Sequence, residues 1–207
     1  VAAASAWAAR ARETRGWVDA AATLDVPYRL PLAGVNVELR QYADDQLDAE
    51  LDRIAQAGFV WVRQPFLWAA LEPEPGAHEW AAYDRIVEAV AAQGDLRLIA
   101  VLDGAPPWAR HELAPDHPFA PPASVGEYAA FAGAVAARYG EAIDFYQVWD
   151  EPNITTHWGN LDVRPAHYAA MLRETYGAIH NADANAQVIA AALAPTVETG
   201  PRNLSDV

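Results

Sequence analysis

A strand that ends in two carboxylates is predicted by the stretch Phe145-Tyr146-Gln147-Val148-Trp149-Asp150-Glu151-Pro152-Asn153. Val148 and Trp149 suit a pleated, buried surface. Pro152 has no backbone N–H to donate, so strand pairing should stop there. Asp150 and Glu151 then stand at the carboxyl end of the strand, which is where the chemistry of an α/β barrel takes place. The stretch therefore predicts a fold whose strand ends carry the function.

The rest of the chain alternates between strand-like and helical segments. The predicted strands are 32–38, 59–63, 96–102, 143–149 and 187–193, and the predicted helices are 44–57, 80–91, 124–139 and 165–179. Each strand–helix–strand connection should be parallel and right-handed. No glycine-rich phosphate loop follows the first strand, which argues against a nucleotide-binding doubly wound fold. We therefore predict an α/β fold, a (β/α)8 TIM barrel with about the first five β/α units present.

The length bears on how much of that barrel the chain holds. A complete barrel typically takes about 250 residues, and this chain has 207. Five strands alone would leave two open sheet edges. We expect the amino-terminal part of a longer protein, with residues 29–207 forming a partial barrel and residues 1–28 an amino-terminal arm or leader.

Composition narrows the classes of partner. The formal net charge is −14 and all 14 basic residues other than histidine are arginine, with no basic stripe, which argues against nucleic acid and anionic membranes. No apolar run reaches membrane-spanning length. The chain has no cysteine, so disulfides, thiolate metal sites and thiol nucleophiles are excluded. The histidines show no metal-binding spacing, and no cofactor is expected. The compartment stays open, with an extracytoplasmic or secreted location favoured.

Polar side chains recur where the predicted strands end. They are Asn36, Glu38, Arg63, Asp103, Asp150, Glu151 and Thr196. A ring of polar groups with carboxylates at a barrel mouth suits glycosidic bond cleavage, in which one carboxyl group protonates the leaving oxygen and a second acts as nucleophile or base. The acid needs a raised pKa, which burial or a neighbouring negative charge supplies.

Each candidate also has a structural explanation. Glu151 and Asp150 could be solvated acids after a strand, and Arg63 could belong to a buried structural ion pair. Asp103 could be a turn acid, which is common before glycine. Glu198 follows the fifth strand and is a poor candidate for a catalytic carboxylate.

The chain resembles a known group of enzymes at three places. Trp149-Asp150-Glu151-Pro152-Asn153 is similar to the Trp-Asn-Glu-Pro-Asn signature of clan A glycoside hydrolases, closest to family 39 and its family 5-like relatives. The segments 62–76 and 98–108 resemble the second-strand and third-strand segments of these enzymes. The resemblance covers about residues 32–203, nearly the whole chain.

This resemblance implies a retaining glycosidase that acts on β-linked oligo- or polysaccharides. Glu151 would be its general acid/base, and the nucleophile, a glutamate at the end of strand seven, would lie outside this chain. Arg63 would sit beneath the sugar subsite and orient a catalytic carboxylate. The residues expected to bind a carbohydrate substrate are Asp150, Arg63, Asp103, Asn36, His157, Trp158 and Trp108.

Asp150 departs from the family pattern, which has asparagine at this position. The amide donates a hydrogen bond to the 2-hydroxyl of the substrate, whereas an ionised aspartate can only accept one. Successive strand residues face opposite sides, so Asp150 and Glu151 can both face the cleft only if the strand end is bulged. The change would alter substrate preference, slow catalysis or mark a lost activity. The alternative function is therefore an inactive carbohydrate-binding or scaffold relative.

Overall fold

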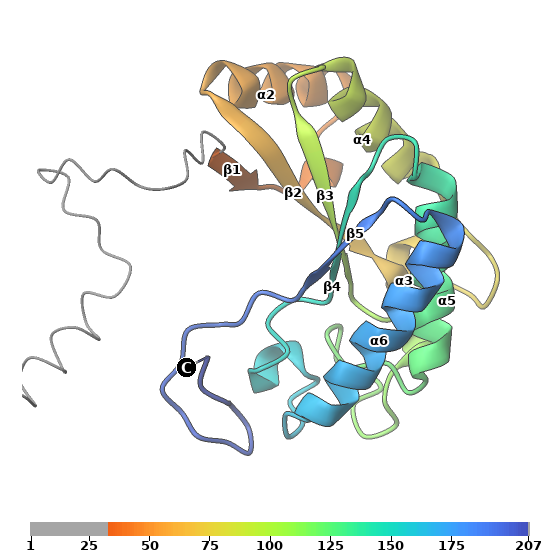
Figure 1. Ribbon diagram of the computed structural model, residues 1–207, viewed down its shortest axis with the longest axis vertical. Helices are drawn as coiled ribbons and strands as arrows, with labels where there is room; N and C mark the ends of the chain where they lie inside the picture. Colours follow the sequence, from red (N-terminus) through yellow and green to blue (C-terminus); the bar gives the residue numbers. More distant parts are fainter. Residues whose placement is uncertain (1–32, 207) are drawn as a thin grey trace, which may run out of the picture. The chain divides into compact units, whose positions relative to one another are not determined.

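The structure, a computed structural model, describes residues 33–206 (Figure 1). The predicted arm at 1–28 lies outside the described residues, so the arm and the domain boundary beside it stay predictions. The strands are β1 (Ala33–Asn36), β2 (Phe59–Leu67), β3 (Arg97–Asp103), β4 (Phe145–Val148) and β5 (Gln187–Ala190). The α-helices are α2 (Asp44–Gln56), α3 (Trp68–Leu71), α4 (Ala81–Ala92), α5 (Val125–Tyr139) and α6 (Pro165–Ala182), and the 3-10 turns are η1 (Leu39–Gln41), η2 (Pro107–Ala109) and η3 (Thr155–His157).

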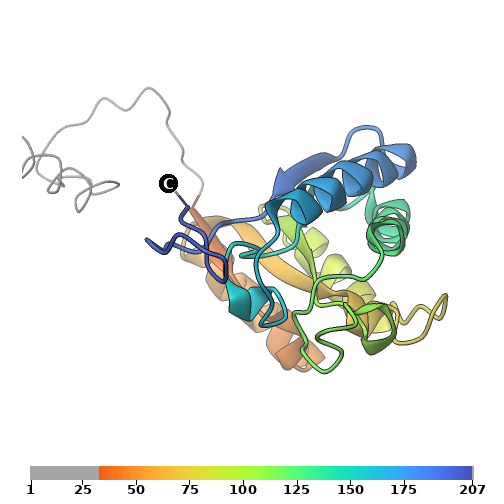
Figure 2. The same ribbon diagram turned by 90° about the horizontal axis from the view of Figure 1, so that it is seen from below.

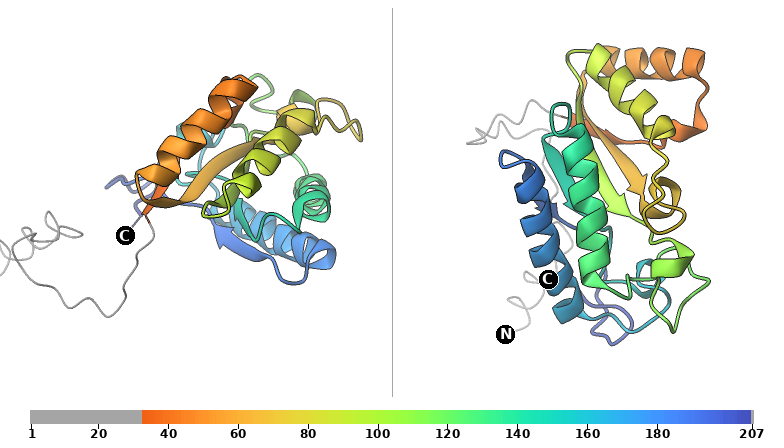
Figure 3. Two further views of the ribbon diagram at one scale, coloured as in Figure 1. Left: turned by 90° about the horizontal axis from the view of Figure 1, so that it is seen from above. Right: turned by 90° about the vertical axis from the view of Figure 1, so that its right-hand side faces the viewer.

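The five strands form one parallel sheet in chain order, β1-β2-β3-β4-β5. The long helices α2, α4, α5 and α6 all lie on the same face of this sheet (Figure 3). A doubly wound fold would reverse its strand order and place helices on both faces. Sequential order with helices on one face is the arrangement of successive units in a (β/α)8 barrel, so the predicted fold class is confirmed.

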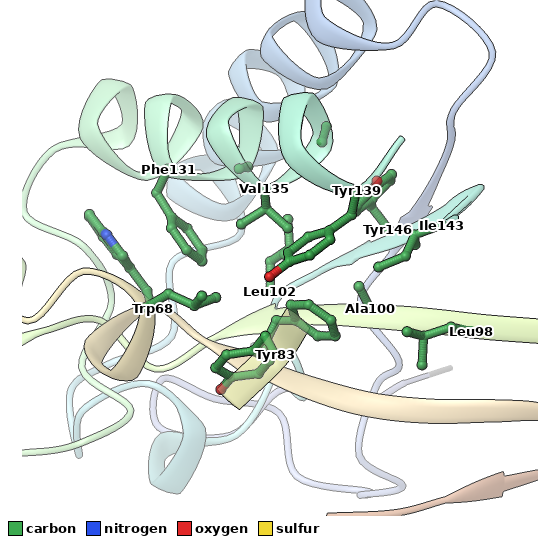
Figure 4. Packing of buried hydrophobic residues seen from close by; sticks show 14 of the residues in the cluster. Trp68, Tyr83, Leu98, Ala100, Leu102, Phe131, Val135, Tyr139, Ile143 and Tyr146 are labelled. Atoms are coloured by element: carbon green, nitrogen blue, oxygen red, sulfur yellow. The ribbon is translucent and has the colours of Figure 1, made fainter. Parts of the chain in front are cut away.

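The hydrophobic core fills the space between the sheet and these helices (Figure 4). Leu98, Ala100 and Leu102 alternate along β3 and are buried on its helix-facing side. Phe131 of α5 stacks on Trp68 at a centroid distance of 5.3 Å. Burying a side chain of leucine or phenylalanine size contributes roughly 1.5–3 kcal/mol. This packing fixes the helices to the sheet and so sets the positions of the strand ends.

The opposite face of the sheet carries the side chains of the intervening residues. Because side chains alternate along a strand, Trp61 and Arg63 of β2 and Phe145 and Gln147 of β4 point to this face. Trp61 and Phe145 pack edge to face at 4.9 Å. No helix within residues 33–206 covers this face. Among these residues, no helix is long and apolar enough to cross a membrane.

The structure differs from the sequence prediction at a few boundaries. β2 was expected to end at Arg63, but it continues through Pro65 to Leu67. The Arg63 carbonyl accepts from the Val37 N–H at 3.0 Å, so by alternation Pro65 faces the same side, where β1 has already ended. The absence of a backbone N–H at Pro65 therefore leaves no strand-pairing hydrogen bond unmade. Gly58 and Gly94 end their helices with φ of +85° and +67°, whereas Gly140 stays helical at −59°.

Candidate active site

The backbone leaves the regular strand conformation directly after β4. Trp149 and Glu151 have φ of +64° and +45°, in the left-handed region that residues other than glycine rarely adopt. Such strain costs about 1–3 kcal/mol per residue and is found where the surroundings enforce it. The Glu151 N–H donates to the Ala192 carbonyl at 3.0 Å, and the Glu151 carbonyl accepts from Ile154 at 3.2 Å. The strand end is therefore kinked, so regular alternation no longer places Asp150 and Glu151 on opposite faces of the sheet.

Two side chains hold the kink in place. Trp149 is fully buried, and its indole N–H donates to the His157 carbonyl at 2.9 Å. The Asn153 amide N–H2 donates to the carbonyls of Ala194 and Leu204, both at 2.9 Å, and its oxygen accepts from the Ala194 N–H at 2.8 Å. The loop after β4 is thereby tied to the segments that follow β5, and Figure 2 views the end of the sheet where they meet.

Arg63 is the centre of a polar network on the face of the sheet opposite the helices, which we call the inner face. Its guanidinium donates to Asp150 Oδ1 at 2.6 Å, to Gln147 Oε1 at 3.0 Å and to Asn36 Oδ1 at 3.1 Å. The side chains of Arg63 and Asp150 are each 23% exposed. Gln147 also donates to Asp150 Oδ1 at 3.2 Å and to the Trp149 carbonyl at 2.8 Å. The structure thus brings together Asn36, Arg63 and Asp150, three of the predicted substrate-binding residues.

Asp103, at the end of β3, is affected by the charges of Arg63 and Asp150 in this network. It is 5% exposed, and burial raises its pKa to about 7. The Gly104 N–H, which donates to Asp103 Oδ1 at 2.8 Å, and the charge of Arg63 lower this pKa, while the charge of Asp150 raises it. A buried carboxyl group that titrates near neutral pH therefore lies beside the Arg63–Asp150 pair.

Glu151 has a different environment from Asp150. Its Oε2 lies 3.7 Å from His157 Nε2, and its side chain is 34% exposed. His157 stacks on Phe119 with parallel rings at 4.8 Å. Asp150 is therefore held in an ion pair with arginine, whereas Glu151 is partly exposed and has an imidazole as its neighbour. Two adjacent carboxylates in unlike surroundings are suited to different roles.

The structure places the two predicted tryptophans away from the Arg63–Asp150 network. Trp158 is 1% exposed and packs edge to face against Trp149 at 6.1 Å. Trp108 donates its indole N–H to the Glu72 carbonyl at 3.2 Å and contacts Trp68 edge to face at 5.3 Å. Trp158 supports the kinked strand end from within the core. Trp108 belongs to a hollow beside α5.

Two residues of the site went unnoticed in the sequence. Gln147 is 4% exposed and bridges Arg63 and Asp150. Alternation along β4 could have found it, since a polar residue two positions after Phe145 points to the same face of the sheet as Phe145. Phe119, which stacks on His157, lies in the irregular proline-rich segment between β3 and α5. No local pattern predicts where such a segment places its side chains.

Comparisons with known proteins agree with this fold. Residues 38–118 match the family model described as beta-galactosidase. The chain resembles the amino-terminal part of a glycoside hydrolase barrel. A family 39 glycoside hydrolase from Bacteroides cellulosilyticus WH2 is 22% identical, with a TM-score of 0.60, and the match covers 76% of this chain and 30% of that one. The predicted resemblance to glycoside hydrolases is thereby confirmed.

Other glycoside hydrolases give similar matches. An exo-beta-1,4-mannosidase from Opitutaceae bacterium strain TAV5 is 21% identical with a TM-score of 0.60, covering 76% of this chain and 31% of that one. Endo-glycoceramidase II from Rhodococcus sp. is 23% identical with a TM-score of 0.58, covering 79% and 48%. The chain spans less than half the length of these structures, and at such identities the likeness shows the fold. A comparison with curated proteins found no match.

Proposed function

We propose that this chain supplies the acid/base half of a retaining glycoside hydrolase that cleaves β-linked oligo- or polysaccharides. The observation that carries the proposal is the kinked end of β4, which presents Glu151 beside His157 while Asp150 is held by Arg63. Glu151 protonates the glycosidic oxygen as the bond breaks, and it later removes a proton from the water that releases the sugar.

The second carboxylate of the reaction is expected outside residues 1–207. In a retaining mechanism this nucleophile attacks the anomeric carbon and forms a covalent glycosyl-enzyme, which water then hydrolyses. Arg63 holds Asp150 at 2.6 Å and so fixes its carboxylate at the edge of the sugar site. Asp150 there accepts a hydrogen bond from a sugar hydroxyl, because an ionised carboxylate has no proton to donate. Asn36 and Asp103 complete the polar floor.

Turnover of aryl β-glycosides by the full-length protein tests this assignment. The variant Glu151→Gln keeps the shape of the side chain but cannot transfer a proton. General acid–base catalysis contributes about 10²- to 10⁴-fold, so kcat should fall by this factor on substrates with poor leaving groups. Glu174→Gln, an exposed change on α6, is the control and should leave kcat unchanged. Unchanged turnover in Glu151→Gln would overturn the assignment.

One observation favours a second candidate, a carbohydrate-binding relative without catalysis. Asp150 stands where the resembled enzymes have asparagine, and its ion pair occupies the Arg63 guanidinium. A binding protein would show calorimetric affinity for oligosaccharides that survives Glu151→Gln, together with no hydrolysis by the unmodified protein. Measurable hydrolysis of any aryl glycoside by the unmodified protein decides against this candidate.

A further inference from the structure

A hollow whose lining does not include Asp150, Glu151 or Arg63 lies beside Trp158. Its volume is about 260 Å³, and its lining includes Trp158 and His167. The Trp158 ring meets His167 edge to face at 5.6 Å and Trp149 at 6.1 Å. Typical small-molecule pockets have roughly 300–1,000 Å³, so this one has room for a single sugar-sized or smaller group.

The hollow is lined by an excess of basic side chains. Arg164, just before α6, and Arg202, in the segment after β5, contribute two guanidinium groups, against one carboxylate from Asp162. His111 and His167 add two imidazoles. The chain as a whole carries a net charge of −14, so a basic cluster of this kind contrasts with the remaining surface. Guanidinium groups bind planar or tetrahedral oxyanions through paired hydrogen bonds.

One buried polar atom beside the hollow lacks a partner. His167 Nε2 is buried and makes no hydrogen bond with any described residue. Buried polar atoms of this kind usually have a partner, and an exception calls for an explanation. Burial is the main cause that lowers the pKa of His167, and the positive charges of His111 and Arg164 lower it further. An anion bound in the hollow would relieve the positive potential of these charges.

We propose that this hollow binds an oxyanion group, either the carboxylate of an acidic sugar or a small inorganic anion. Arg164 and Arg202 would supply charge and paired hydrogen bonds, and Trp158 an apolar wall. The proposal stands on this hollow alone and is independent of any catalytic role for Glu151, because binding requires no proton transfer there.

Calorimetric titration of the purified protein tests the proposal with three probes: sodium glucuronate, sodium sulfate and neutral glucose. Measurements at one fixed ionic strength keep the screening of surface charge constant. We expect one molecule of an anionic probe to bind per chain and glucose to bind at least about tenfold more weakly, since a charge-assisted hydrogen bond is lost. Binding of glucuronate without sulfate identifies an acidic sugar as the ligand. Binding of both identifies a general oxyanion site.

Matched variants locate the binding. The double variant Arg164→Gln/Arg202→Gln removes both guanidinium groups and should weaken anion binding by about tenfold or more. Arg173→Gln, which removes an exposed arginine of α6 outside the hollow, should leave the affinity unchanged. NMR titration of His167 adds a second readout, because a bound anion should raise its pKa. Absence of anion binding, equal affinity for glucose, or an unchanged affinity in the double variant would each overturn the proposal.

Discussion

Replacing Asp103 with asparagine should remove a pH-dependent penalty from the stability of this fold. Burial raises the pKa of Asp103 from 3.8 to about 7. The folded state therefore holds this proton more tightly than the unfolded state between those pH values. The free energy of unfolding then falls as the pH rises from about 4 to about 7, and it levels off above that range.

The size of this penalty follows from the displacement of the pKa. A displacement of about three units corresponds to about 4 kcal/mol at 1.36 kcal/mol per unit. Asparagine keeps an oxygen that can accept from the Gly104 N–H, as Asp103 does at 2.8 Å. We therefore expect Asp103→Asn to match the unmodified protein at pH 4 and to exceed its free energy of unfolding by up to about 4 kcal/mol at pH 8.

Urea denaturation at pH 4, 6 and 8 measures the effect. Asp48→Asn, which neutralises an exposed carboxylate on α2, serves as the control and should follow the unmodified protein at every pH. If Asp103→Asn and the unmodified protein lose stability in parallel between pH 4 and pH 8, Asp103 does not carry the penalty and the reasoning is wrong.

Three further predictions concern the Arg63–Asp150 network, the loop after β4 and two glycines at and within helices. Asp150→Asn removes a negative charge that raises the pKa of Asp103, so that pKa should fall, as NMR titration of the carboxyl carbon would record; an unchanged value contradicts the coupling. Asn153→Ala deletes three hydrogen bonds and should cost about 2–4 kcal/mol in urea denaturation, whereas a loss below about 1 kcal/mol would mean that these bonds do not hold the loop. Gly94→Ala should destabilise by about 1–2 kcal/mol because Gly94 has a φ of +67°. Gly177→Ala, inside α6 where an added Cβ would meet no neighbouring atom within 4 Å, should stabilise by roughly 0.5–1 kcal/mol. The same sign for both changes in urea denaturation would refute the argument from backbone conformation.

Periodicity in the sequence was enough to predict the sheet and its four long helices, but not the short helix α3 (Trp68–Leu71). The helix predicted at 124–139 is α5 (Val125–Tyr139) in the structure, where Ser124 lies at the N-cap and accepts from the Glu127 N–H at 3.3 Å. β2 ran beyond its predicted end because Pro65 faces an edge where β1 has stopped, and this depends on the lengths of two strands rather than on local sequence.

The site was predictable where it depends on strand ends and unpredictable where it depends on loops. Alternation and the positions of the strands suffice to bring Asn36, Arg63 and Asp150 together. The left-handed backbone at Trp149 and the burial of Trp158 arise from tertiary packing, which overrides the conformational preference of the residues concerned. The pKa of Asp103 likewise depends on burial by neighbours far along the chain.

The role of Glu151 as acid/base is tested most directly by azide rescue of Glu151→Ala in the full-length protein. An aryl β-glycoside with a good leaving group needs no proton to form the covalent intermediate, and azide attacks that intermediate without needing a base. We predict that azide restores turnover of Glu151→Ala and yields a glycosyl azide with retained β configuration. Unaltered hydrolysis by Glu151→Ala in the absence of azide, or a lack of glycosyl azide when azide is added, would contradict the role proposed for Glu151.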